Sequence, residues 1–420
     1  MPATSLLVAL ALAAPVQDTL SPPARRVLAD VRWLAADARQ GRGAGTEGLG
    51  AAARYVADGF RRAGLAPAAG SSFFQSFTIA ADAPAALHSG LGGTQIANVA
   101  AVLAGSDPAH RGQLVVIGAH YDHLGLGGFG ALDADSGPRV HNGADDNASG
   151  TAALLEIARQ LARRRPARTI VFVAFSGEEL GDLGSAYFVK HPLVGPIDSV
   201  CAMVNLDMVG RLRNGRLLAL GAGTAKEFPV LLDSLNAASG HFDLRASGDG
   251  WGPSDHASFF AAKRPVLHFF TDLHEDYHRA SDDWEKINAA GLAHVAAFAG
   301  EVVWTLANRP APLTFVDAPP PPPQATASGQ GYGAYLGTIP DMSESPGGVR
   351  ITGVRAGSPA ERAGLQAGDV ITAIGAKTVA NLYDMTDALR SHQAGDTVTI
   401  VAKRGETNVR VTAVLGKRGA

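Results

Sequence analysis

Four apolar segments of this 420-residue chain are each followed by side chains that can bind a metal ion or move a proton. These side chains are His120 and Asp122 after LVVIGA, Glu178 and Glu179 after IVFVAFSG, Asp207 after AMVNL, and Tyr277 and His278 after PVLHFF. Imidazoles and carboxylates without cysteine suit zinc or another hard-to-borderline divalent cation. The pattern therefore predicts a metal site built from residues that lie far apart in the sequence.

Taken alone, each of these residues also has a structural explanation. An Asp or Glu after a strand often caps the next helix, and a lone histidine is more often a hydrogen-bonded surface or core residue. The segment HNGADDNASG shifts the balance, because Asp145 and Asp146 stand side by side in a glycine-flanked turn that leads into a helix. Adjacent carboxylates there favour a metal bridge. Asn147-Ala148-Ser149 also matches an N-glycosylation acceptor, but three-residue matches are common by chance.

These residues must be positioned by regular elements, and the sequence pattern predicts that these elements form an α/β domain over residues 25–309. Its apolar runs are short and several are rich in β-branched residues, which is typical of strands buried on both faces of a mostly parallel, helix-flanked sheet. These runs are Leu114–Ile117, Ile170–Phe175, Ala202–Leu206 and Pro265–Phe270. A segment with helical spacing, Ala153–Leu161, separates the first two runs, so the order is strand–helix–strand. The carboxyl ends of such strands converge on one crevice, which would gather the polar residues.

Length and composition limit the possible classes of function. A chain of 420 residues exceeds a single compact core and predicts one large and one small domain. Its 36 basic and 39 acidic residues give a net charge of −3, and the basic residues are scattered. We therefore expect no nucleic-acid partner and no anionic lipid surface. The single cysteine, Cys201, excludes an intramolecular disulfide and a multi-cysteine metal site.

Residues 1–18 predict a secretory signal peptide. The apolar run from Leu6 to Ala14 is too short to span a bilayer, and Ala11 and Ala13 fit an A-x-A cleavage site. No basic region precedes the run, so a frayed apolar N-terminus is the alternative. No later segment predicts a membrane span. An exported protein without a disulfide fits a bacterial periplasm or the cell exterior.

The composition changes after residue 309. Residues 310–333 contain Pro319–Pro323, which favours an extended spacer, and then an Ala/Ser/Gly stretch that favours flexibility. A long surface loop inside one domain is the alternative. In residues 334–417, the strand-like segments VRITGV, DVITAIG, TVTIVAK and NVRVTAVL alternate with turns, and one helical stretch lies near Leu382–Ser391. This pattern predicts a linker followed by a small β-rich domain.

The motifs of residues 25–308 resemble the co-catalytic zinc aminopeptidase family, which also includes glutamate carboxypeptidases and the peptidase-like domains of transferrin receptors. These motifs are HYDHLG, HNGADDNASG, SGEELG, NLDM, and YH followed by SD. The resemblance implies a zinc exopeptidase fold that holds two zinc ions per chain. It implies two ligand sets that share one residue: His120, Asp146 and Asp207 for one ion, and Asp146, Glu179 and His278 for the other. Alignment on the Asn-Ala-Ser-Gly tail makes Asp146, rather than Asp145, the bridge.

The same resemblance assigns roles around the metal ions. Glu178, adjacent to a ligand but not itself one, would take a proton from the zinc-activated water and pass it to the leaving amine. Tyr277 would donate to the developing oxyanion, and a packing tyrosine is the structural alternative. Asp122 would orient His120 from behind, and Asp255, in Ser-Asp-His, would give similar support.

The segment His274–His278 also matches H-E-x-x-H, the zincin signature. That signature requires a helix, which would place both histidines on one face. The preceding PVLHFF predicts a strand instead, and Asp282 with Glu285 predicts the N-terminal cap of a helix that starts afterwards. The zincin interpretation also leaves the other predicted ligands without a role.

Residues 334–417 resemble a PDZ domain of the kind carried by bacterial periplasmic proteases. The motifs that carry this resemblance are AYLGTIPD, GSPAERAGLQAGDVI and AGDTVTIVAKRG. It implies that the loop Tyr335, Leu336, Gly337 and Thr338 presents backbone N–H groups to a peptide carboxylate, while the peptide adds a strand beside it. A PDZ domain that binds nothing is the alternative.

Together, these expectations describe an exported metallo-aminopeptidase that removes N-terminal residues from peptide or protein substrates and holds a C-terminal peptide ligand at its PDZ groove. The same metal site suits a carboxypeptidase or an aminoacyl cyclase, and pocket residues that the motifs do not reveal would decide between them. Outside the enzymes, a catalytically retired fold in a PDZ adaptor is the alternative. The retained Glu178 and the complete ligand set argue against that alternative.

Overall fold

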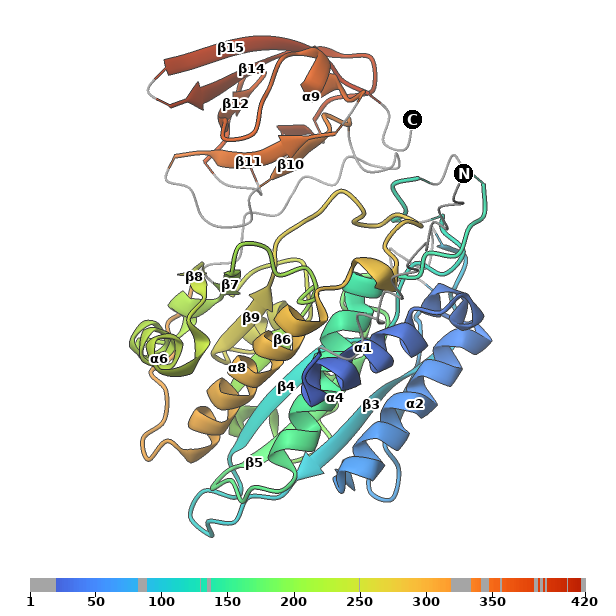
Figure 1. Ribbon diagram of the computed structural model, residues 1–420, viewed down its shortest axis with the longest axis vertical. Coiled ribbons are helices and arrows are strands. Elements are labelled where there is room, and N and C mark those ends of the chain that lie inside the picture. Colours follow the sequence, from blue (N-terminus) through green and yellow to red (C-terminus); the bar gives the residue numbers. More distant parts are fainter. Residues whose placement is uncertain are drawn as a thin grey trace, which may run out of the picture.

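The computed structural model describes residues 20–81, 89–128, 130–133, 137–248, 250–318, 334–340, 347–355, 357–380, 384–385, 388–389, 391–405 and 407–416. The predicted signal peptide, residues 1–18, and residues 319–333 of the predicted linker lie outside this part of the chain. The described residues form two separate sheets, one of nine strands and one of six (Figure 1). The first belongs to an α/β domain and the second to a β-rich domain, so the predicted fold class is confirmed.

The nine-stranded sheet is parallel at its centre. Its strands run in the order β1 (Ala66–Pro67), β3 (Gln95–Leu103), β5 (Thr169–Phe175), β4 (Leu114–His120), β6 (Val200–Leu206), β9 (Val266–Phe270), β7 (Arg216–Leu220) and β8 (Asp243–Ser247), with β2 (Phe74–Thr78) paired to β3. β4 is parallel to β5 and β6, and β6 is parallel to β9. The four strands that precede the polar motifs are therefore direct neighbours, and their carboxyl ends lie at one edge.

Helices cover both faces of this sheet. The helices on one face, drawn in front of the sheet in Figure 1, are α1 (Pro22–Leu34), α2 (Glu47–Ala63), α4 (Gly150–Leu161) and α8 (Ala289–Asn308). On the other face, α5 (Leu183–Lys190) and α7 (His256–Ala261) pack through Phe188 and Phe259. Within β4, Val115 enters the first core and Val116 the second. Burial on both faces explains why the strand is a continuous apolar run.

Capping groups fix the ends of the longer helices. The Ser21 hydroxyl accepts from the Ala24 N–H at 3.4 Å before α1, and the Asn288 side chain accepts from the Gly291 N–H at 2.9 Å before α8. α2 ends at Gly64, whose φ of 92° is typical of a left-handed C-cap. The remaining helical elements of this domain are α6 (Phe228–Leu235) and the short turns Asp37–Arg42, Ala144–Ser149, Ile197–Ser199, Ala222–Thr224, Asn236–Gly240 and Trp284–Lys286.

Within the described residues, α8 is the one helix with the length and apolarity of a membrane span. However, 67% of its apolar window is buried inside the protein, where the helix packs against α1 and α4. That burial is typical of the core helix of a folded domain.

Residues 310–318, which the sequence assigns to the linker, pack against the α/β domain. The Thr314 N–H and hydroxyl donate to the Glu227 carboxylate at 2.9 and 2.8 Å. The Phe315 ring contacts the Phe260 ring, with 5.7 Å between the ring centroids. A free tether therefore does not begin at residue 310.

The C-terminal domain is a six-stranded sheet closed over a small core of its own. Its strands run in the order β10 (Thr338–Pro340), β11 (Val349–Val354), β12 (Val370–Ile374), β14 (Thr397–Arg404) and β15 (Thr407–Val414), with β13 (Lys377–Thr378) paired to β12. α9 (Pro359–Arg362) is its short helix. The core includes Leu336, Ile351, Ile371 and Ile400. Of the predicted helical stretch, residues 384–385 and 388–389 are helical, and several others lie outside the described residues.

Candidate metal centre

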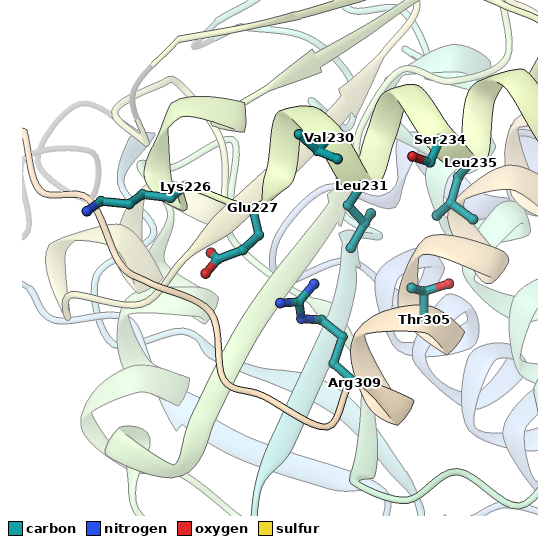
Figure 2. Close-up of a pocket in the computed structure, with 8 residues that line it drawn as sticks. All are labelled: Lys226, Glu227, Val230, Leu231, Ser234, Leu235, Thr305 and Arg309. Carbon is teal, nitrogen blue, oxygen red and sulfur yellow. The ribbon is translucent and has the colours of Figure 1, made fainter.

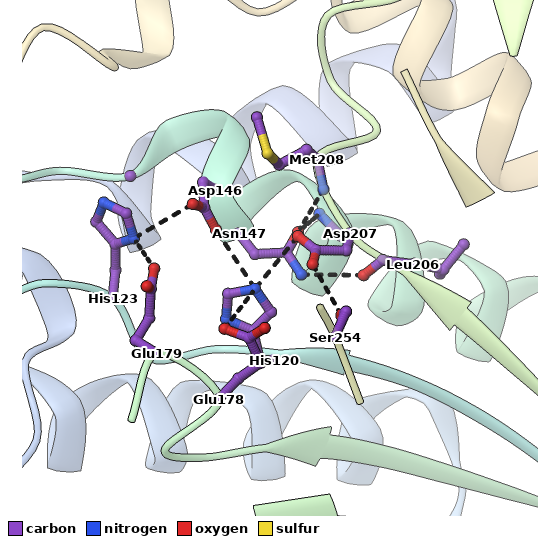
Figure 3. Close-up of polar contacts among 12 residues, drawn as sticks. His120, His123, Asp146, Asn147, Glu178, Glu179, Leu206, Asp207, Met208 and Ser254 are labelled. Atoms are coloured by element: carbon purple, nitrogen blue, oxygen red, sulfur yellow. Dashed lines mark hydrogen bonds and ion pairs between the residues drawn. The ribbon is translucent and has the colours of Figure 1, made fainter. Parts of the chain in front are cut away.

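The candidate metal centre lies at the carboxyl ends of β4, β5 and β6 (Figure 3). His120 is the last residue of β4, and Asp207 directly follows β6. In the parallel β4–β5 pair, His120 lies opposite Phe175, the last residue of β5. Glu178, which follows the end of β5, therefore lies at the same edge of the sheet as His120. The sheet thus brings together side chains that lie far apart in the sequence.

One group of polar side-chain atoms surrounds the Nε2 atom of His120. Asp207 Oδ1 lies 3.2 Å from this nitrogen, Asp146 Oδ1 lies 3.4 Å away, and Glu178 Oε2 lies 3.8 Å away. The His120 side chain is 1% exposed. The Ser254 hydroxyl donates to the second oxygen of Asp207 at 2.9 Å, which leaves Oδ1 directed at the imidazole. An imidazole and carboxylates that converge in this way can hold a divalent cation.

A second group of ligand atoms surrounds the Nε2 atom of His278. It lies 3.2 Å from Asp146 Oδ2 and 3.2 Å from Glu179 Oε2. The other ring nitrogen of His278 donates to the carbonyl oxygen of Gly130 at 2.9 Å, so Nε2 is the nitrogen directed at the two carboxylates. Asp146 directs one oxygen at each group and thus occupies the bridging position.

Asp145 faces away from both groups. Its Oδ1 accepts from the Gly210 N–H at 2.6 Å, and its Oδ2 lies 3.1 Å from the Nε2 atom of His274. Both oxygens are therefore used in holding the turn Ala144–Ser149 in place. Of the two adjacent carboxylates, Asp146 is the one that the structure places between the two groups.

The turn that carries Asp146 is fixed by a buried carboxylate. Asp282 Oδ2 accepts from the backbone N–H groups of Asp145 and Asp146 at 2.8 and 3.1 Å. Its Oδ1 accepts from Arg211 at 2.8 Å. The expected N-cap role of Asp282 is wrong, because α8 starts later, with Asn288 as its cap.

The donor set fits zinc. Two imidazole nitrogens and the carboxylates of Asp146, Glu179 and Asp207 form the two groups. Zinc accepts mixed nitrogen and oxygen ligands, whereas calcium and magnesium prefer oxygen alone.

Comparisons with known proteins identify both domains. Residues 98–303 match the model of peptidase family M28, and residues 334–415 match that of the PDZ domain. The α/β domain belongs to peptidase family M28.

Relatives and solved structures agree with this M28 assignment. A probable zinc metalloprotease of Leptosphaeria maculans is 35% identical over 168 residues, which are 39% of this chain and 35% of the relative. A zinc aminopeptidase of Bacillus subtilis has a TM-score of 0.56 at 18% identity, covering 69% of this chain and 98% of that one. For Porphyromonas gingivalis glutaminyl cyclase the TM-score is 0.53 at 22% identity, covering 66% and 96%. These low identities show a shared fold. The chain spans 24–60% of the length of the first curated relatives it matches.

Burial and neighbouring charges set different protonation preferences in the M28 site. Burial raises the pKa of the Glu178 carboxyl well above its usual range. Burial acts in the same direction on Glu179, but the imidazoles of His278 and His123 outweigh it and hold the pKa of Glu179 at about 2. Burial lowers the pKa of His278, and the carboxylates of Glu179 and Asp146 raise it to about 10. Glu178 is thus suited to carry a proton, whereas Glu179 stays a carboxylate.

His123 is a site residue that the sequence analysis missed. Its Nδ1–H donates to Glu179 Oε1 at 2.6 Å, and its Nδ1 lies 3.9 Å from Asp146 Oδ2. Its ring packs over Gly143, where an added Cβ would lie 2.4 Å from the ring. Nε2 is buried and has no hydrogen-bond partner among the described residues. The sequence feature that could have indicated His123 is the second histidine of the HYDH motif.

Arg42 was missed as well. Its guanidinium is fully buried and donates to the carbonyl oxygens of Tyr121, Leu34, Asn142 and Gly143 at 2.7–2.9 Å. Burial lowers the pKa of Arg42 to about 10, while nearby carboxylates act in the opposite direction. Arg42 therefore ties the loop after β4 to the loop that leads into Ala144–Ser149.

The two predicted supporting aspartates differ from expectation. The Asp122 carboxylate lies 3.9 Å from His120 Nδ1, whereas the backbone carbonyl oxygen of Asp122 lies closer to this nitrogen, at 3.3 Å. Its Oδ1 instead accepts from the Glu178 N–H at 3.3 Å. Asp255 is buried, and neither of its oxygens has a hydrogen-bond partner within the described residues. Ser254, its neighbour, is the residue that supports Asp207.

The segment His274–His278 is not a zincin helix. Residues 275–278 form a turn, and the two histidines diverge: His274 contacts Asp145, whereas His278 lies in the second group. The Tyr277 ring stacks on that of His278, with 3.9 Å between the centroids. Burial, and after it the nearby carboxylates, raise the pKa of Tyr277 well above its usual value, so its hydroxyl stays protonated.

A separate hollow of about 500 Å³ lies between α6 and the end of α8 (Figure 2). Its lining residues are Lys226, Glu227, Val230, Leu231, Ser234, Leu235, Thr305 and Arg309. None of them belongs to the metal centre, and Glu227 is already engaged by Thr314. This hollow is therefore separate from the candidate metal centre at the sheet edge.

Proposed function

We propose that this protein is an exported two-zinc aminopeptidase. The observation that carries the proposal is the position of Asp146, whose two oxygens face two separate imidazole–carboxylate groups beside the partly buried carboxyl of Glu178. Zinc ions held there would polarise a substrate carbonyl and make a water molecule more acidic. His120, Asp146 and Asp207 would hold one ion, and Asp146, Glu179 and His278 the other.

Glu178 moves the proton in this mechanism. Its carboxyl lies beside His120, and its backbone N–H is anchored by Asp122, so the side chain starts from a fixed point. A carboxyl whose pKa is raised by burial accepts a proton from the attacking water more readily than an ordinary glutamate does. The same carboxyl then gives this proton to the leaving amine.

Tyr277 stabilises the oxygen of the substrate carbonyl. Its hydroxyl stays protonated because burial disfavours the phenolate. Stacking on His278 fixes the ring beside the second group of ligands. A protonated hydroxyl held there can donate to negative charge that develops during the attack.

A substrate panel tests the activity. We expect aminoacyl anilides with a free amine to be cleaved, N-acetylated anilides to be resistant, and metal analysis to return two zinc ions per chain. An aminoacyl cyclase, favoured by the likeness to glutaminyl cyclase, would instead cyclise N-terminal glutamine. A carboxypeptidase would release the last residue of a peptide with a blocked N-terminus. Zinc binding without turnover of any of these substrates would favour a retired fold in a PDZ adaptor.

The PDZ domain completes the proposal. Its first loop offers backbone donors to a peptide carboxylate, so we assign it C-terminal peptide binding. Export follows from the predicted signal peptide, and N-terminal sequencing of the protein from a periplasmic fraction tests it. The expected mature chain begins near residue 19, whereas an intact Met1 would contradict export through this segment.

A further inference from the structure

The strand β10 forms an open edge of the PDZ sheet. It pairs with β11 on one side, and the sheet order places no strand on its other side among the described residues. An open edge can accept a further strand, with backbone groups that alternate between the two sides. Which backbone groups face outward therefore determines what this edge can bind.

The hydrogen-bond pattern shows which residues face outward. The Arg355 N–H donates to the Gly337 carbonyl at 2.8 Å, and Thr338 lies opposite Val354. In an antiparallel pair with this hydrogen-bonding pattern, Thr338 and Val354 are a non-hydrogen-bonded pair. The N–H and C=O of Thr338 therefore point to the open side, and those of Ile339 point to β11. The next outward position is Pro340, whose nitrogen carries no hydrogen.

The loop before β10 offers donors without acceptors. The carbonyl oxygens of Leu336 and Gly337 are occupied by the N–H groups of Ala360 and Arg355, both at 2.8 Å. The N–H groups of Leu336 and Gly337 have no partner within the described residues. Gly337 has a φ of +86°, and an added Cβ would lie 2.3 Å from the Ser358 Cβ, so only glycine fits. Successive free N–H groups of this kind favour an anion such as a carboxylate.

We propose that this PDZ domain makes no backbone hydrogen bond to the carbonyl of the third-last residue of a peptide. This inference rests on the C-terminal peptide binding proposed above. The carboxylate binds the loop, and the N–H of the last residue donates to the carbonyl of Thr338. The third-last residue then lies opposite Pro340, where its carbonyl meets a proline ring instead of an N–H group. Strand pairing is therefore weakened at that point, because only the N–H of the third-last residue can bond there, to the Pro340 carbonyl.

This limit suits a domain that is joined to an aminopeptidase. Each turnover removes one residue from the N-terminus of a substrate and leaves its C-terminus unchanged. A groove that paired with five or six residues would lose contacts as the substrate shortened. A groove that forms few backbone hydrogen bonds beyond the last two residues keeps most of its affinity as the substrate shortens.

A ligand series isolates the third-last carbonyl. The experiment uses the full chain with the substitution Glu178→Gln, which prevents turnover. Its ligands are acylated, so they lack the free amine that an aminopeptidase site would bind. An N-propionyl amino acid covers the last two positions, and an N-acetyl dipeptide adds the carbonyl of the third. Longer N-acetyl peptides with the same last two residues extend the series. Competition against a fluorescent N-acetyl hexapeptide measures each affinity.

In the wild-type PDZ domain we expect no gain in affinity when the carbonyl of the third-last residue is added. Pro340→Ala restores an outward N–H, so the step that adds the carbonyl should gain about 3- to 10-fold in affinity. Gly337→Val should abolish binding at every length, because its Cβ would clash with Ser358. A wild-type gain as large as that of Pro340→Ala overturns the inference. If C-terminal amides bind as well as acids, or nothing binds, the peptide-binding function itself is wrong and the inference falls with it.

Discussion

The two candidate sites of this protein are built from different parts of the chain. The M28 metal centre consists of buried and partly buried side chains, some of which are held in place by groups behind them, as Ser254 holds Asp207. The PDZ edge consists of backbone groups from Leu336 to Thr338, and Pro340 lacks the next outward N–H. One site depends on which side chains are present, and the other on which backbone groups remain free.

This difference predicts opposite responses to mutation. In the metal centre, an isosteric change of one carboxyl group removes chemistry without moving the backbone. At the PDZ edge, most side chains are interchangeable, whereas a change at Gly337 or Pro340 alters the hydrogen-bonding pattern itself. The comparison would fail if an isosteric change of a carboxyl group left the chemistry of the metal centre intact, or if an ordinary side-chain change at the PDZ edge abolished peptide binding.

The largest effect is expected from Glu178→Gln. This change keeps the shape of the side chain but removes the proton acceptor, so turnover should fall roughly 10²–10⁴-fold while the zinc content persists. Steady-state kinetics with an aminoacyl anilide and elemental analysis measure the two quantities. Glu275→Gln is the matched control, because Glu275 is exposed in the turn before His278. Near-normal turnover of Glu178→Gln would remove this residue from the mechanism.

Asp146→Ala should come next, with a loss of both metal ions. Asp146 is the residue whose oxygens face both groups, so its removal weakens both at once. The matched control is Asp145→Asn, which keeps an acceptor for the Gly210 N–H and should lower Tm by a few degrees without a change in metal content. Elemental analysis that finds two zinc ions in Asp146→Ala would contradict the bridge.

Much of the metal centre could be predicted because its residues follow strands. Buried parallel strands are readable as apolar runs, and the residue after such a run must lie at the sheet edge. His120, Asp207 and Glu178 are of this kind. Asp146 is different: the turn itself does not distinguish it from Asp145, and only the motif alignment did so.

The residues that were missed act through the backbone or through another ligand. Arg42 binds carbonyl oxygens of two loops, and no sequence pattern reveals which carbonyls a distant arginine will meet. Asp282 carries a capping pattern, yet it binds the N–H groups of Asp145 and Asp146, because the fold brings that turn closer than the next helix. Contacts between distant loops need the tertiary structure.

His123 tests whether support for a ligand matters as much as the ligand. His123→Phe fills the same space but removes the N–H that fixes Glu179, so the affinity for one zinc ion should fall about 10- to 100-fold. His123→Asn, which retains an N–H donor, should recover part of this loss. Competition with a fluorescent zinc chelator gives both affinities. Equal losses in the two variants would mean that the ring itself, rather than its hydrogen bond, supports the site.

The smallest effect concerns the connection between the two sites. The chain up to Ala318 remains in contact with the M28 domain, because the Trp251 indole N–H donates to the backbone carbonyl of Ala318 at 3.2 Å. Thr314 and Phe315 contribute further contacts. A truncation meant to remove only the PDZ domain must therefore end after residue 318, and one that ends at Asn308 should lower Tm.

Truncation after Ala318 should leave the kcat/KM of single-residue anilides unchanged, because such substrates cannot reach both sites. For peptides of several residues with a free carboxylate, KM should rise several-fold, because the PDZ groove no longer raises their effective concentration near the metal centre. Amidation of the peptide C-terminus in the full-length protein should give the same rise, which separates loss of the groove from loss of stability. Unchanged peptide kinetics in the truncated protein would assign the PDZ domain to localisation or assembly. Loss of anilide turnover would show instead that the metal centre depends on the PDZ domain, and the contrast between two independent sites would fail.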